Sequence, residues 1–158
     1  MLVRDSAHDL FSLGTAEARA VGLADAARLA TPTALSDEPA DPATVARAVG
    51  EVAPALGDGT GLTHFTDPLL RDKLATLVAA EIRGGPAELV LCVGVDALPL
   101  GVDVHRLRCA LAAEGLASGW RPVTAVHLAD VGIPAPAEDL AMALVWIAAP
   151  APPAVDHA

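Results

Sequence analysis

The spacing of apolar residues changes abruptly at Gly84-Gly85, and this change constrains the fold more than any other feature of the sequence. Before it, apolar side chains recur every three or four residues from Leu70 to Ile82, which is the spacing of one helix face. After it, residues 88–95 form a short continuous apolar run rich in β-branched side chains, typical of a strand covered on both faces. The two patterns in one chain predict an α/β or α+β fold.

The remaining C-terminal sequence predicts further elements of the same fold. Residues 102–116 have the spacing of a helix, and residues 121–128 form a second short run rich in β-branched side chains. The apolar stretch 140–148 suits either a helix or a strand, and we favour a strand antiparallel to its neighbour because it contains Leu-Val-Trp-Ile. We therefore expect a small sheet of about three strands, 88–95, 121–128 and 140–148, covered by helices.

The N-terminal third of the chain is expected to be helical, with interruptions. Gly14 and Gly22 fall inside its helical pattern and weaken it. A polar, proline-containing turn at residues 32–39 is the expected flexible connection to the rest. Beyond it, Asp41-Pro42 and Asp67-Pro68 each combine an N-cap aspartate with proline at the first helical position, so a helix is predicted to begin at both.

Charge and length limit the class of protein. The chain has 158 residues with 10 basic and 20 acidic side chains, a net charge of −10, which argues against nucleic acid and against anionic membrane surfaces as partners. The longest apolar run, 140–149, would span only about 15 Å as a helix and cannot cross a bilayer. We expect one globular domain over residues 1–150, followed by a flexible Pro/Ala-rich tail at 151–158.

The two cysteines, Cys92 and Cys109, both lie among apolar neighbours. Two are too few for a disulfide framework or for a cysteine-based zinc site. We expect both to be buried, reduced thiols and the protein to be cytoplasmic. The sequence predicts no metal and no cofactor.

Five polar residues follow the predicted strands and could form a site. In open α/β sheets, ligands bind outside the carboxyl ends of the strands, and carboxylates with imidazoles could bind a divalent metal or transfer a proton there. The alternative and preferred interpretation is that the aspartates are turn and helix-cap residues and the histidines ordinary strand or surface residues. The five candidates are Asp96, Asp103, His105, His127 and Asp130.

The glycine-rich segment Gly57–Gly61 is a second candidate site, because its backbone N–H groups could cradle a phosphate. Its Gly-x-Gly-x-Gly spacing departs from the dinucleotide fingerprint, and the next helix start lies only at Asp67. We favour a flexible linker here.

The sequence contains no complete catalytic motif that we recognise. The preferred hypothesis is therefore a non-catalytic cytosolic accessory or binding protein that acts through protein–protein association. The alternative is a small enzyme, or an α/β domain that binds a metal or a phosphate ligand, with its site at the strand carboxyl ends. Trp120 and Trp146 are expected in or beside the contact of a homodimer or of another protein partner, since tryptophan is enriched at interface centres. For Trp146, a place in the domain's own core remains open.

Overall fold

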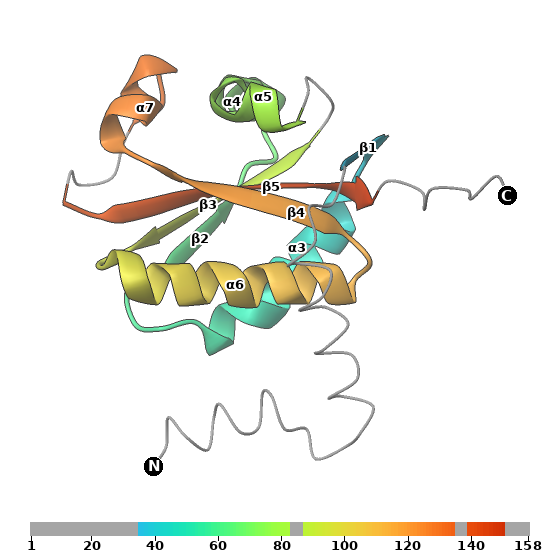
Figure 1. Ribbon diagram of the computed structural model, residues 1–158, viewed down its shortest axis with the longest axis horizontal. Coiled ribbons are helices and arrows are strands. Elements are labelled where there is room, and N and C mark those ends of the chain that lie inside the picture. The colour runs from blue at the N-terminus through green and yellow to red at the C-terminus, as the bar shows by residue number, and fades with distance from the viewer. Residues whose placement is uncertain (1–34, 83–86, 135–138, 151–158) are drawn as a thin grey trace, which may run out of the picture.

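A five-stranded antiparallel sheet lies at the centre of the structure, a computed structural model that describes residues 35–82, 87–134 and 139–150. Helices α3 and α6 cover one face of this sheet, and α4, α5 and α7 cover the other (Figure 1). The strands are β1 (Leu35–Pro39), β2 (Gly61–His64), β3 (Glu88–Gly94), β4 (Ala117–Val123) and β5 (Ala141–Pro150). The helices are α3 (Pro42–Val52), α4 (Pro68–Ala75), α5 (Ala79–Ile82), α6 (Ala97–Ala113) and α7 (Ala125–Asp130).

Strand β5 organises the sheet, because it pairs with β1, β3 and β4. Its residues 142–147 pair with both β3 and β4, so these two strands lie on opposite sides of it. Both are antiparallel to β5, hence parallel to each other, and α6 connects them. The carboxyl ends of β3 and β4 therefore lie at the same end of the sheet, beside the start of β5.

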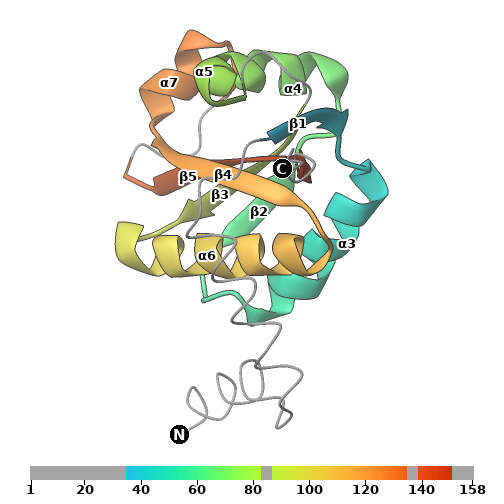
Figure 2. The same ribbon diagram turned by 45° about the vertical axis from the view of Figure 1, so that its right-hand side comes forward.

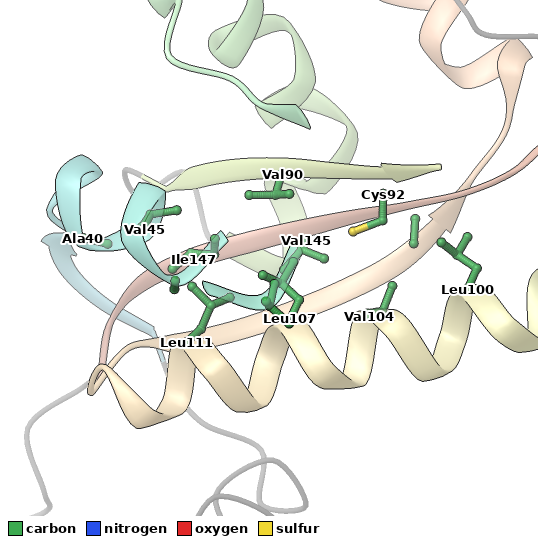
Figure 3. Packing of buried hydrophobic residues seen from close by; sticks show 13 residues of the cluster. Ala40, Val45, Val90, Cys92, Leu100, Val104, Leu107, Leu111, Val145 and Ile147 are labelled. Atoms are coloured by element: carbon green, nitrogen blue, oxygen red, sulfur yellow. The ribbon is translucent and has the colours of Figure 1, made fainter. Parts of the chain in front are cut away.

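The sheet is apolar on both faces, which explains the continuous apolar runs in the sequence. Along β5, Val145 and Ile147 pack on the face that also contains Leu107 and Leu111 of α6 (Figure 3). Leu144 and Trp146, which alternate with them along β5, pack on the opposite face with side chains of α4, α5 and α7.

Both predicted helix starts are confirmed. The backbone N–H of Leu69 donates to Asp67 Oδ1 at 2.8 Å at the start of α4, and the N–H of Ala43 donates to Asp41 Oδ1 at 3.3 Å at the start of α3. Each cap satisfies a backbone donor that the first helical turn leaves without a partner.

The predicted fold class is confirmed, but the number of strands is five rather than three. The strands expected at 88–95 and 140–148 are present as β3 and β5, and β5 is antiparallel as predicted. Strand β1 occupies part of the polar turn that was expected to be a flexible connection, and β2 begins at the last glycine of the expected linker. Both are short, and they form ladders with β5 and β3 that no local pattern reveals.

The strand expected at 121–128 is displaced in the structure. Strand β4 runs from Ala117 to Val123, and residues 125–130 form α7 instead. The reason is Thr124, whose side chain caps a helix at the point where the strand was expected to continue. The expected N-terminal helical third and the tail at 151–158 lie outside the described residues. Within the described part, no helix is long and apolar enough to span a membrane.

Candidate functional site

A hollow of about 310 Å³ lies at the end of the sheet where β3 and β4 finish and β5 begins. Its walls come from the first turns of α6, the second half of β4, the start of α7 and residues 140–143. Figure 2 shows these segments together at one end of the molecule, although they are far apart in the sequence. The site is therefore assembled by the sheet topology.

The lining of the hollow is apolar. Leu100 of α6, Trp120 and Pro122 of β4 and Met142 of β5 contribute to it, and none of the described lining side chains is charged. The Trp120 side chain lies at the rim with 39% of its surface exposed. A lining of this kind suits a mostly apolar ligand, because binding removes apolar surface from water and leaves no charge buried without a partner.

Two helices begin at the hollow. Ala97, the first residue of α6, lines it, and so do Thr124 and Ala125 at the start of α7. The N-terminal end of a helix carries a partial positive charge, and at α6 this end lies next to the carboxylate of Asp96.

A capping box fixes the start of α7. The backbone N–H of His127 donates to Thr124 Oγ1 at 3.3 Å, and the N–H of Thr124 donates to His127 Nδ1 at 3.1 Å. Nδ1 must therefore be unprotonated, with the imidazole proton on Nε2. In this position His127 holds the wall of the hollow rather than lining it.

The five sequence candidates do not form one cluster. Asp96 is the N-cap residue of α6 beside the hollow, and its side chain makes no capping hydrogen bond. Asp130 ends α7, and His105 lies on the outer side of α6. In the described ranges, no group of three or more His, Cys, Asp or Glu side chains could hold a metal ion.

Asp103 has a structural partner set of its own. Its buried carboxylate accepts hydrogen bonds from the Gly57 N–H at 3.2 Å, from the Thr60 hydroxyl at 2.7 Å and from Arg106 Nη1 at 3.1 Å. A protein carboxylate thus occupies the position beside the glycine-rich segment where a phosphate would bind. The segment is a tethered turn in which Gly59 has a φ of +84°, rather than a flexible linker.

One buried polar cluster was not predicted from the sequence. Glu88 is buried at the start of β3, where Oε1 lies 3.3 Å from His64 Nε2 and Oε2 accepts a hydrogen bond from Arg71 Nη1 at 3.1 Å. A glutamate directly before an apolar strand was the available signal. The cluster lies at the opposite end of β3 from the hollow and does not contribute to it.

The two cysteines differ in burial. Cys92 is fully buried in the sheet, and burial, together with the charge of Asp103, raises its pKa to about 12, so its thiol is protonated and unreactive. Cys109 is only half-buried, which corrects the expectation for that residue, and its Sγ lies 3.6 Å from His105 Nε2.

Of the two tryptophans, Trp146 is in the core and Trp120 is at the hollow. The Trp146 side chain is 9% exposed, and its ring lies against Gly119 of the neighbouring strand.

Solved structures with a similar fold include two oxidoreductases by name. Nitroreductase A from Vibrio parahaemolyticus RIMD 2210633 matches with a TM-score of 0.55 at 13% identity, over 78% of this chain and 65% of the other. The NADPH:FMN oxidoreductase from Vibrio harveyi, complexed with NAD+, matches with a TM-score of 0.54 at 13% identity, over 78% of this chain and 68% of the other. The chain thus spans about two thirds of the length of these proteins. No protein-family model and no curated protein sequence matches it.

These comparisons correct the expectation of a non-catalytic accessory protein. The two solved structures named above are both enzymes by name, so that expectation is wrong. The alternative hypothesis from the sequence, a small enzyme or ligand-binding domain with its site at the strand carboxyl ends, is better supported. At 13% identity, the likeness itself shows the fold alone.

Proposed function

We propose that this chain is an oxidoreductase domain that holds the ring system of a flavin in the hollow between α6, β4 and β5. The observation that carries the proposal is the apolar lining of that hollow at the carboxyl ends of β3 and β4. The proposal is supported by the second solved neighbour, which is named as an NADPH:FMN oxidoreductase.

The residues present fit the ring of a flavin. The hollow, at about 310 Å³, is near the lower end of the roughly 300–1,000 Å³ typical of small-molecule sites. Leu100 and Met142 are among the apolar residues that would hold the ring, and Trp120 at the rim would shield it from water. A bound flavin supplies hydride acceptance and electron transfer, chemistry for which side chains have no equivalent.

The chain's own contribution would be electrostatic and steric. The apolar wall would exclude water from the ring. The partial positive charge at the start of α6 lies beside the hollow, and the Asp96 carboxylate offsets it in part. No acid or base among the described lining residues is needed for this role.

We also propose that the protein is a cytoplasmic homodimer in which a second copy covers the open side of the hollow. Leu98 and Val102, in the first turns of α6 next to the lining residues Ala97 and Gly101, are exposed. A second copy that covered the hollow would also bury this exposed apolar surface, and burying it favours association. The buried, protonated thiol of Cys92 suits the reducing cytoplasm.

The test fills the hollow. Gly101 of α6 lines it, and a Cβ at this position would meet nothing within 4 Å, so Gly101→Leu places a side chain there without a backbone clash. We expect the unaltered protein to bind FMN or riboflavin saturably, measured by the change in flavin fluorescence, and Gly101→Leu to weaken that binding at least tenfold.

Gly50→Leu is the matched control, because Gly50 is also a helical glycine with open space at its Cβ, on α3. It should leave flavin binding unchanged. The absence of saturable binding of either flavin to the unaltered protein, or equal binding by Gly101→Leu, would exclude the proposed function.

A further inference from the structure

We infer that the hollow recognises the ring of a flavin without its phosphate, so that an uncharged flavin such as riboflavin is a better ligand than FMN. This inference rests on the proposed function and specifies its ligand class. It departs from the name of the second solved neighbour, which specifies FMN. Three features of the described residues support it.

The first feature is the engagement of the arginines. A flavin phosphate is usually recognised through charge-assisted hydrogen bonds, for which arginine is the most suitable donor. Every described arginine already donates to an oxygen of the protein, and none lines the hollow. The pairs are Arg47 with Glu114, Arg71 with Glu88, Arg106 with Asp103, Arg108 with the Ser118 carbonyl and Arg121 with the Leu77 carbonyl.

The second feature is Asp96. It is the N-cap residue of α6, directly before the lining residue Ala97, and its carboxylate makes no capping hydrogen bond. The positive end of α6 would otherwise be the most favourable position for a phosphate near the hollow. A carboxylate at that position repels a second anion, so α6 favours an uncharged ligand or one with delocalised charge.

The third feature is the polarity of the walls. Thr124 supplies the only side-chain hydroxyl among the described lining residues, and one neutral hydroxyl replaces little of the hydration of a phosphate. A phosphate that entered the hollow would lose its hydration without gaining a charged partner. A phosphate that stayed in water would gain nothing from the protein, whose net charge is −10.

The experiment compares the dissociation constants of riboflavin and FMN for the full chain, by fluorescence titration at low and at physiological ionic strength. At low salt we expect the dissociation constant of riboflavin to be lower than that of FMN by a factor of about three or more. The difference should shrink at higher salt because exposed charges are then screened.

Asp96→Asn is the diagnostic variant. It should strengthen FMN binding severalfold and leave riboflavin binding unchanged, which closes the gap between the two ligands. Asp72→Asn is the control, since Asp72 is an exposed aspartate of α4 on the opposite face of the sheet, and neither ligand should respond to it.

The outcomes separate this inference from the proposed function. FMN binding more tightly than riboflavin would overturn the inference and leave the flavin function standing. Equal affinities that Asp96→Asn leaves equal would overturn it as well, because Asp96 would then repel nothing. Binding of neither flavin would instead exclude the function on which the inference rests.

Discussion

Cys92 shows how the environment of one residue determines its chemistry. In the sequence, Cys92 and Cys109 look alike, since both have apolar neighbours. In the structure, Cys92 is sealed between the sheet and α6, with the Asp103 carboxylate near enough to disfavour a second negative charge. Cys109 is half-buried on α6 beside His105. Burial of a single residue on a helix depends on which helix face is covered, and this was not evident from its immediate neighbours.

The difference predicts selective thiol chemistry. In a Cys109→Ser variant, the remaining thiol of Cys92 should resist an aromatic disulfide reagent at pH 8 and react at once in urea. The folded state raises the pKa of Cys92 from 9.0 to about 12 and so favours the neutral thiol. This stabilising contribution is complete below pH 9 and is lost as the pH rises from 9 towards 12. Rapid stoichiometric labelling of the folded variant at pH 8 would contradict the burial of Cys92.

At the scale of elements, strands covered on both faces were predictable and strands defined by pairing were not. β3 and β5 have continuous apolar runs because both faces are buried. β2 has only four residues, alternately exposed and half-buried, and its pairing with β3 is what makes it a strand. The sequence indicated only where a site would lie, at the carboxyl ends of the strands, and not which residues line the hollow. Its lining combines α6, β4, α7 and β5, and no single segment carries that pattern.

The pairing of β4 with β5 leads to a prediction about their contact. A Cβ added at Gly119 would lie 2.4 Å from the Trp146 ring, so Gly119→Ala forces the ring or the strand to move. We expect a loss of about 1–3 kcal/mol in the free energy of unfolding, measured with urea, as is typical of overpacked cores. Gly61→Ala in β2 is the control, because a Cβ at Gly61 meets nothing within 4 Å.

A double-mutant cycle assigns the loss to this contact. In a Trp146→Leu background, the smaller side chain should reduce the cost of Gly119→Ala by 1 kcal/mol or more, roughly the size of coupling seen between touching residues. Equal costs in both backgrounds would place the strain elsewhere on β4.

At the scale of the whole molecule, the exposed apolar side chains are unevenly distributed. Six large apolar residues are exposed in the described ranges, and five of them belong to the elements that form the hollow or directly precede them. The sixth, Leu69, lies on α4. The five are Val95, Leu98, Val102, Trp120 and Val126. Strand β4 is also an edge of the sheet, and exposed edges favour pairing with another chain.

This distribution predicts a homodimer formed through the hollow end of the molecule. Light scattering should give about twice the 15.9 kDa mass of one chain. Leu98 is 82% exposed at the start of α6, so Leu98→Asp should dissociate the dimer without unfolding the chain, because an isolated charge is costly only where a partner buries it. Leu69→Asp is the matched control, because Leu69 is 64% exposed on α4, and it should leave the mass unchanged.

If a second copy covers the hollow, Leu98→Asp should also weaken flavin binding in proportion to the fraction of monomer, which a dilution series measures. A monomeric unaltered protein that binds flavin fully would remove the second copy from the site.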